Sequence, residues 1–421
     1  MLNHSSRRLP LPGFGLLILS MVALSACAAG TGSSASGRAS DAAATPATAA
    51  APVSAAMQTA TVTATPTAAT SHSSATASAI GTSTAVAAPV ALAHGSAAAT
   101  SGATVYGISA PELLNQPTQV QQIRAMKAMG VTSVRLDANW YWGQPNGPDS
   151  FDWTSLDQIV ASIQQVGLSA DFIIDGCPSW AAVSGAQGDE FAQPASSAEF
   201  AKWAGAVAAR YGARGVKYFE IGNEPNLSGS WEPKPDPAAY TADLIAAYAA
   251  IKAVDPSAVV ISGGLAPAAN TSTSYDPRTF LEDMYADGAK GSFDGVGDHP
   301  YSFPAEPDDD ESWSAWSQMS ETTPSLRSIM IENGDSAKKI WITEYGAPTT
   351  GSNSVTETEQ STELVQAISE VKQFSWIGSF YIYTWSDLSS LPAVDNGFGL
   401  LAEGNVQKPA YTAVAAALDS I

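Results

Sequence analysis

The chain has 421 residues, of which 40 are acidic and 19 basic, so its formal net charge is −21. This excess of negative charge argues against nucleic acid or an anionic membrane surface as a partner of the folded part, because both repel it. The cysteines are Cys27 and Cys177, and His299 is the single histidine after residue 103, so we expect no disulfide, no metal site and no cofactor, in a monomer.

The N-terminal segment has the pattern of an export signal. Two arginines precede an apolar run at residues 11–23, which is too short to span a bilayer as a mature helix. The run leads into Leu-Ser-Ala-Cys at 24–27, which resembles the bacterial lipobox, where the cysteine is lipid-modified. We therefore expect residues 1–27 to be a lipoprotein signal peptide and Cys27 to anchor the protein to the membrane of the bacterial cell envelope, at the outer membrane or cell surface. The alternative is an ordinary secretory signal and a secreted protein.

The composition changes after this segment. Residues 28–103 are dominated by Ala, Ser, Thr, Gly and Pro and show no periodic apolar face, which predicts a disordered linker. Residues 104–421 have the length of one large α/β barrel and are predicted to form a single folded domain.

Within the predicted domain, β-rich runs alternate with amphipathic helical runs. The strands are expected at 104–109, 132–137, 169–175, 216–222, 258–264, 293–299, 339–345 and 379–385. The clearest helical patterns lie at 120–130, 155–167, 198–212, 238–254 and 357–374. This alternation predicts parallel pairing through right-handed crossovers and closure into a (β/α)8, or TIM, barrel. The alternative is an open doubly wound sheet, but the glycine-rich phosphate turn that would support it is absent after the first strand.

Polar and aromatic residues gather at the C-terminal ends of the predicted strands, where TIM barrels place their functional sites. They are Arg135, Asp137, Asn223, Glu224, His299, Tyr301, Glu344 and Trp385. Residues far apart in the chain would therefore meet at one mouth of the barrel, and Glu224 would face Glu344.

Two motifs carry a resemblance to known enzymes: Asn-Glu-Pro at 223–225 and Trp-Ile-Thr-Glu-Tyr-Gly at 341–346. With them, residues 104–421 resemble the retaining glycoside hydrolases of clan A, and in detail family 39, particularly bacterial exopolysaccharide hydrolases of the PslG kind. The finer likeness rests on Pro-Ser-Trp at 178–180, Asp-His-Pro-Tyr at 298–301, Phe-Gly-Leu-Leu at 398–401 and Lys-Pro-Ala-Tyr at 408–411. The resemblance implies a catalytic domain in which Glu224 is the proton donor, or acid/base, and Glu344 is the nucleophile.

The chemistry of the neighbouring residues supports these roles independently. Glycoside hydrolysis needs one protonated and one ionised carboxyl group across the scissile bond. Arg135 can hold Glu344 ionised, and Tyr301 can donate a hydrogen bond to the same carboxylate. The negative field of Glu344 then keeps the proton on Glu224, while Asn223 can bond a sugar 2-hydroxyl. We expect the two carboxyl groups to lie at the short separation of retaining enzymes.

The remaining candidates concern sugar recognition. We expect Trp385 to form the floor of the sugar site and Trp180 to line the cleft, with packing in the core as the alternative for any tryptophan. Trp140 and Trp142 follow the second predicted strand, Trp180 the third and Trp231 the fourth, so all four lie in loops on one face of the barrel. His299 is expected to hydrogen-bond within the site.

Two acidic residues have a structural alternative. Asp137 either touches substrate or only caps a loop, and Glu220 is expected to form a structural ion pair with Arg135.

The predicted function is hydrolysis of a β-linked polysaccharide or oligosaccharide by double displacement, outside the cytoplasm. Internal cutting is favoured because the loops after the second and sixth strands look long enough to wall a groove. One alternative is a non-catalytic carbohydrate-binding envelope lipoprotein, which would be expected to have lost a carboxyl group. The other is a transglycosylase that uses the same two glutamates and differs only in its acceptor.

Overall fold

The computed structural model describes residues 102–186, 189–309, 311–351, 353–387 and 396–421. The predicted signal peptide with Cys27, and all but the last two residues of the predicted linker, lie outside the described residues. Among the described helices, none is both long and apolar enough to cross a membrane.

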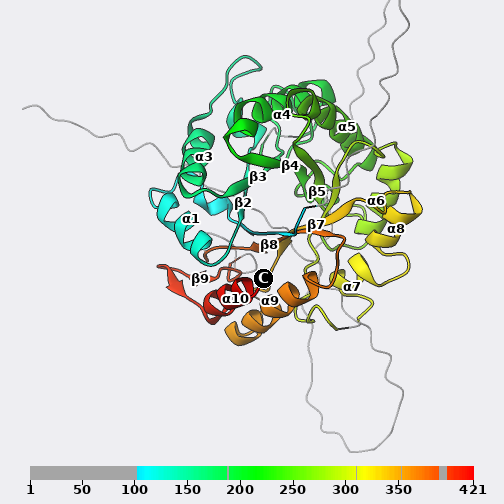
Figure 1. The fold of residues 1–421 in the computed structure, drawn as a ribbon. Coiled ribbons are helices and arrows are strands. Elements are labelled where there is room, and N and C mark those ends of the chain that lie inside the picture. Colours follow the sequence, from blue (N-terminus) through cyan, green and yellow to red (C-terminus); the bar gives the residue numbers. More distant parts are fainter. Residues whose placement is uncertain (1–101, 187–188, 310, 352, 388–395) are drawn as a thin grey trace, which may run out of the picture. The chain divides into compact units, whose positions relative to one another are not determined.

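Eight parallel strands close into a barrel in the order of the chain, with β8 pairing back onto β1 (Figure 1). They are β1 Val105–Ser109, β2 Ser133–Asp137, β3 Ser169–Ile174, β4 Val216–Asn223, β5 Val259–Gly264, β6 Gly295–Asp298, β7 Lys339–Tyr345 and β8 Ile377–Tyr383. Their residues are almost continuously buried, as expected when helices cover the outer face of a parallel sheet. The predicted TIM barrel is confirmed, and the open sheet is excluded.

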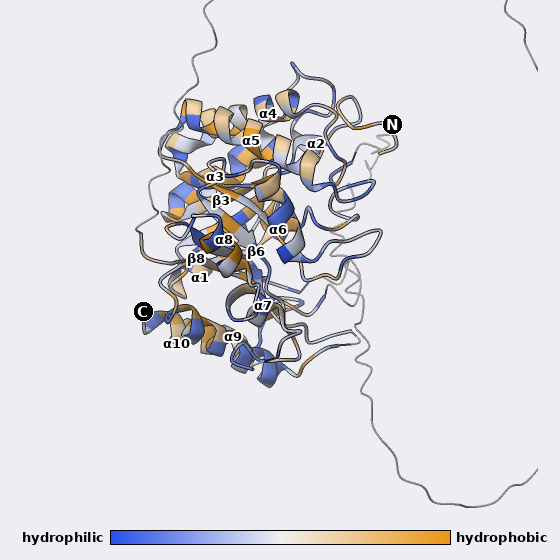
Figure 2. Ribbon diagram, turned by 90° about the vertical axis from the view of Figure 1, so that its right-hand side faces the viewer, coloured by the Kyte–Doolittle hydropathy of each residue, from blue (hydrophilic) through white to orange (hydrophobic). Residues whose placement is uncertain are grey.

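Helices surround this barrel (Figure 1). They are α1 Gln119–Ala128, α2 Trp140–Gly143, α3 Thr154–Val166, α4 Ser197–Tyr211, α5 Pro237–Val254, α6 Pro277–Ala286, α7 Ala315–Ser320, α8 Leu326–Glu332, α9 Glu357–Val371 and α10 Pro409–Asp419. Most carry orange and blue segments in Figure 2, as amphipathic helices do. Helix α3 buries Leu156, Ile159 and Ile163, spaced three and four residues apart, and ends at Gly167 in the left-handed conformation with φ 77°.

Several of these helices are absent from the sequence-based prediction. Helices α2, α7 and α8 have only 4, 6 and 7 residues, too few for a helical period to show in the sequence. The hairpin of β9 Leu401–Ala402 and β10 Val406–Gln407 was not predicted either, because each strand has two residues.

The last barrel strand corrects the prediction of 379–385, since β8 ends at Tyr383. Beyond it the chain turns toward β9, where the amide of Leu400 donates to the carbonyl of Thr384 at 3.1 Å. The amide of Leu401 likewise donates to the carbonyl of Trp385 at 3.0 Å. The carbonyl of Trp385 is therefore bonded to the hairpin segment, beyond the end of the barrel strand.

Candidate active site

Glu224 follows the last residue of β4 in an uncommon backbone conformation. Its φ of 47° lies in the left-handed region, which costs a residue other than glycine about 1–3 kcal/mol. Its amide donates to the carbonyl of Gly264 at the end of β5, at 3.0 Å, and this bond fixes the turn. The carboxylate faces His299, whose Nδ1 lies 3.0 Å from Glu224 Oε1. The strained turn thus sets the direction of a buried acid.

Glu344 sits in β7 with a partner on each carboxylate oxygen. Arg135 Nη1 donates to Oε1 at 2.5 Å, and the Tyr301 hydroxyl donates to Oε2 at 2.8 Å. Burial opposes ionisation, but the charges of His299 and Arg135 and the two hydrogen bonds outweigh it and lower the pKa of Glu344 below its ordinary value. This carboxyl group is held as a carboxylate, as a nucleophile requires.

The two carboxylates lie close together. One oxygen of Glu224, one oxygen of Glu344 and one ring nitrogen of His299 are all within 4.8 Å of one another. Retaining glycosidases hold their carboxyl groups about 5–5.5 Å apart, and inverting ones about 6.5–9.5 Å. The distance matches the short separation predicted from the sequence and leaves no room for a water between Glu344 and the sugar.

Arg135 ties the floor of this site together. Its Nε donates to Glu220 Oε2 at 2.6 Å, which confirms the predicted ion pair, and its Nη2 donates to Asn223 Oδ1 at 2.7 Å. The guanidinium is 1% exposed and pairs with carboxylates on β4 and β7 at once. The planar fork of arginine donors suits this task, whereas a lysine would offer only a point charge.

Replacing Arg135 should therefore cost stability as well as activity. Arg135→Met leaves Glu220 and Glu344 buried without their cation, so we expect the free energy of unfolding to fall by about 3–5 kcal/mol. Arg210→Met is the matched control, because Arg210 pairs with Asp157 where the two side chains are 38% and 36% exposed. We expect it to cost about 1 kcal/mol or less. Urea unfolding measures both, and equal losses would contradict the buried network.

His299 connects the acid to the interior of the barrel. Its Nε2 lies 3.0 Å from the hydroxyl of Thr343, which donates to Glu220 Oε1 at 3.0 Å. Burial opposes a charge on His299, but the carboxylates of Glu344 and Glu224 outweigh it and raise the pKa of the ring above its ordinary value. The prediction that His299 hydrogen-bonds within the site is confirmed.

Trp385 does not take the place expected of it. It is 1% exposed and packs against Tyr411 of α10 with ring centroids 5.8 Å apart, because β8 ends two residues earlier than predicted. Tyr383, the last residue of β8, instead packs on Phe398 at 5.4 Å, and Phe398 packs on Tyr301 at 5.7 Å. The aromatic residue that the strand carries to the site is Tyr383, which the sequence analysis missed.

The other tryptophans divide into two groups. Trp140 and Trp231 are buried in the hydrophobic core, so for them the packing alternative holds. Trp180 and Trp142 are 37% and 42% exposed. Trp180 is held in place, since its Nε1 donates to the carbonyl of Gln144 at 2.8 Å. It presents an exposed aromatic surface in the loop after β3.

Asp137 ends β2 and is half-buried. The pKa of its carboxyl is raised to about 6, because burial and, to a lesser extent, the charge of Glu344 outweigh the lowering effect of Arg135. Asp175 and Glu190, in the chain after β3, interact electrostatically with Asp137. Burial and the charge of Asp137 raise the pKa values of both carboxyls. Three acidic side chains therefore crowd this side of the mouth.

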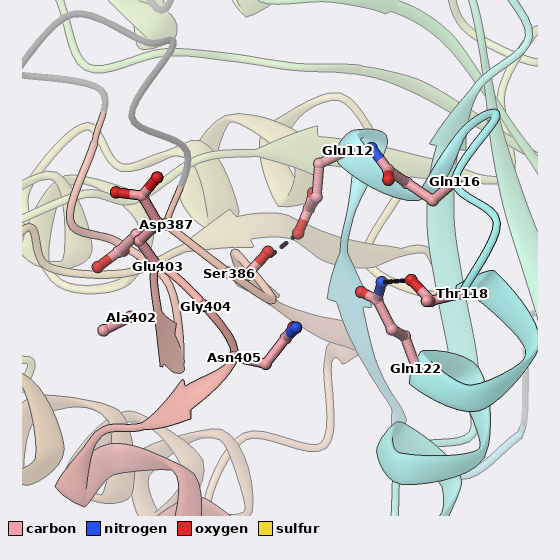
Figure 3. A pocket seen from close by; sticks show the side chains of 10 residues that line it. All are labelled: Glu112, Gln116, Thr118, Gln122, Ser386, Asp387, Ala402, Glu403, Gly404 and Asn405. Atoms are coloured by element: carbon pink, nitrogen blue, oxygen red, sulfur yellow. Dashed lines mark hydrogen bonds between the residues drawn. The ribbon is translucent and has the colours of Figure 1, made fainter.

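The described part of the chain also contains a cavity of about 270 Å³ (Figure 3). Its lining comes from the chain after β1 and from the β8–β10 segment, and includes neither Glu224 nor Glu344. In Figure 3 Glu112 and Ser386 point toward each other, and the Ser386 amide donates to Glu112 Oε1 at 3.1 Å. The cavity is separate from the carboxylate pair.

Within the described residues, Glu224, His299 and Glu344 are the one group of three side chains spaced closely enough to hold a metal ion. The Arg135 guanidinium and the Tyr301 hydroxyl already occupy the two oxygens of Glu344. A cation here would meet a buried positive charge, so the donor set suits proton transfer better than metal binding.

The comparisons with known proteins agree with this geometry. A family model described as cellulase, glycosyl hydrolase family 5, matches residues 95–383. Comparison with curated proteins gives no match.

Solved structures share the fold at low sequence identity. A family 39 glycoside hydrolase from Bacteroides cellulosilyticus WH2 is 21% identical with a TM-score of 0.60, covering 74% of this chain and 63% of its own. A GH5_18 protein from Bifidobacterium longum subsp. infantis is 16% identical with a TM-score of 0.54, covering 75% and 79%. An exo-β-1,4-mannosidase from Opitutaceae bacterium strain TAV5 is 16% identical with a TM-score of 0.52, covering 76% and 59%.

The present chain thus spans less than two thirds of the length of the first and third of these proteins. The predicted clan is confirmed, and the family that matches is family 5, where the sequence analysis expected family 39. With a closed TIM barrel, two glutamates at its mouth and a family match over most of the folded chain, this protein belongs to the cellulase family, glycosyl hydrolase family 5.

Proposed function

We propose that the protein hydrolyses a β-linked polysaccharide by double displacement, with Glu344 as nucleophile and Glu224 as acid/base. The observation that carries this proposal is the approach of the two carboxylates to within 4.8 Å, one of them held ionised by Arg135 and Tyr301. A non-catalytic descendant of the fold would have no need to keep this pair and its partners.

The proposed reaction has two steps. In the first, a Glu344 oxygen attacks the anomeric carbon, the bond to the leaving oxygen breaks, and Glu224 gives that oxygen its proton. In the second, Glu224 takes a proton from water, the water oxygen bonds to the anomeric carbon, and the ester to Glu344 breaks. The charge on Glu344 vanishes in the intermediate, which favours ionisation of Glu224 when it must act as a base.

Other side chains would position the sugar. Asn223 has its oxygen held by Arg135, so its amide nitrogen is directed to donate to the 2-hydroxyl. Tyr383, which is 1% exposed and packs on Phe398, would support the wall beside the reacting sugar from behind, on the strand to which the sequence analysis assigned Trp385. Trp180 would stack on a neighbouring sugar through its exposed face.

The charge of the chain bears on the class of substrate. Its net charge of −21 repels an anionic polymer, so we propose a neutral or cationic β-linked polymer, cut internally. The likeness to family 39 exopolysaccharide hydrolases adds bacterial exopolysaccharides to the candidates.

A panel of polymers tests the proposal. We expect oligosaccharides of mixed length from at least one of β-glucan, xylan, mannan and neutral bacterial exopolysaccharide, and none from a uronic acid polymer of similar linkage. Release of single sugars alone would contradict internal cutting. Longer products in the presence of an added sugar acceptor, with little reducing sugar formed, would favour transglycosylation.

We further propose that Cys27 carries lipid and anchors the enzyme to the cell envelope. This rests on the apolar run and Leu-Ser-Ala-Cys at 24–27. The native protein should partition with membranes, whereas Cys27→Ala should be soluble and fully active. Native protein in the culture medium with an unmodified start after residue 27 would support an ordinary secretory signal instead.

A further inference from the structure

An unbroken series of hydrogen bonds joins the two glutamates beneath the reacting centre. It runs through Glu224, His299, Thr343, Glu220, Arg135 and Glu344. Each of these residues is buried. The roles of Thr343 and His299 in this series follow from counting donors and acceptors.

Glu220 can only accept hydrogen bonds. Its Oε2 is paired with Arg135, and its Oε1 accepts from the Gly264 amide at 2.7 Å and from the Thr343 hydroxyl at 3.0 Å. A hydroxyl has one hydrogen to donate, and Thr343 donates it to Glu220. The Thr343 oxygen must therefore accept from His299, which places a proton on Nε2.

This assignment decides what lies between His299 and Glu224. If the ring is neutral, its Nδ1 carries no hydrogen and must accept one from Glu224 Oε1, 3.0 Å away. If the ring is charged, Nδ1–H donates to the Glu224 carboxylate. In both forms the pair holds one proton between Nδ1 and Oε1, and this is the proton that the leaving group takes.

We propose that Thr343 is a positioning residue for the acid/base step, which keeps the Nε2 proton of His299 in place so that Nδ1 and Glu224 share the catalytic proton. This inference rests on the proposed role of Glu224. Without the Thr343 oxygen, the neutral ring can carry its proton on Nδ1 and donate to the Glu224 carboxylate, which favours the carboxylate over the protonated acid that the leaving group needs.

The backbone at Gly264 gives this arrangement its space. A Cβ on Gly264 would lie 2.2 Å from His299 Nε2 and 2.5 Å from Thr343 Oγ1, so only glycine allows the ring and the hydroxyl to meet there. The amide of Gly264 also donates to Glu220 Oε1, so this last residue of β5 contacts both hydrogen-bond partners of the Thr343 hydroxyl, His299 and Glu220.

Other charged and titratable groups also face His299 and stay in place when Thr343 is changed. Glu344 Oε2 lies 3.7 Å from Nδ1, and the Tyr301 ring lies edge-on at 6.1 Å. Arg135 opposes the charge on His299, and Asp298 precedes it on β6. Because Thr343→Val leaves these groups in place, a change in the pH profile of the variant reports the loss of the Thr343 hydroxyl.

The first test compares two variants at Thr343. Thr343→Val keeps the shape and removes the hydroxyl. On a substrate with a poor leaving group, we expect kcat to fall about tenfold, and the alkaline limb of kcat/KM to move down by about one pH unit. Thr343→Ser should restore the limb. The control is Thr241→Val in α5, which removes a buried hydroxyl that has no hydrogen-bond partner. We expect this variant to have the kcat and the alkaline limb of wild type.

The second test uses the unaltered Thr343, so it does not depend on whether the Thr343 variants fold. In the full chain with 15N-labelled histidine, the signals of His299 are those lost in His299→Gln. A protonated Nε2 in every state, with Nδ1 gaining its proton only in the charged ring, supports the proposal. A neutral ring protonated on Nδ1 overturns it, as does an alkaline limb of Thr343→Val that coincides with wild type. If Glu224→Gln leaves activity intact, the proposed function itself fails.

Discussion

Glu344→Ala is expected to lower kcat by about 10⁵-fold, because no covalent glycosyl-enzyme can form without the carboxylate. The site would keep its acid, its sugar contacts and Arg135, so a small nucleophile in the vacated space should restore turnover. Added azide should attack the β-linked substrate from the opposite face and give the α-glycosyl azide. Identification of this product by NMR would assign the nucleophile directly.

A matched variant separates this effect from the loss of any buried acid. Glu363 in α9 is 1% exposed, and burial together with the charges of Glu306 and Glu359 raises its pKa to about 8. It is therefore protonated at neutral pH, and Glu363→Gln should leave kcat within about twofold of wild type. Turnover by Glu344→Ala at the wild-type rate on a natural polymer would remove Glu344 from the mechanism.

Glu224→Ala is expected to lower kcat/KM by about 10²–10⁴-fold on polymers, whose leaving group needs a proton. Substrates with an acidic leaving group, such as a dinitrophenyl glycoside, should still glycosylate Glu344 rapidly and accumulate the intermediate, because hydrolysis then lacks its base. Azide should release this intermediate as the β-glycosyl azide, the opposite anomer to that from Glu344→Ala. A uniform loss on good and poor leaving groups would speak against Glu224 as the acid.

The sequence predicted the barrel and the two glutamates because both depend on local patterns. Eight β-rich runs alternate with helical ones, and the ends of parallel strands must meet at one edge. Glu224 and Glu344 stand directly at such ends, so their meeting needs no knowledge of side-chain packing. Arg135 and Tyr301 followed from the charge balance that a carboxylate nucleophile requires.

What the sequence could not provide depends on contacts between distant segments. Trp385 was expected at the sugar because the β-rich run continues through it, but hydrogen bonds to Leu400 and Leu401 end the strand at Tyr383. No local sequence pattern predicts those hydrogen bonds. Trp140 and Trp231 likewise follow strands, yet tertiary packing buries them. Thr343 carried a weak signal, as a polar residue within a buried strand, but its meaning required the position of His299.

The anomer formed first from a β-linked substrate tests the double displacement most directly. Carboxylate oxygens within 4.8 Å of each other leave room for attack by Glu344 but not for a water between it and the sugar. Two inversions in sequence return the original configuration. Proton NMR of the reaction in its first minutes, before mutarotation, should show the β-anomer as the initial product. An initial α-anomer would contradict the account, since it would mean that water, and not Glu344, attacks the sugar.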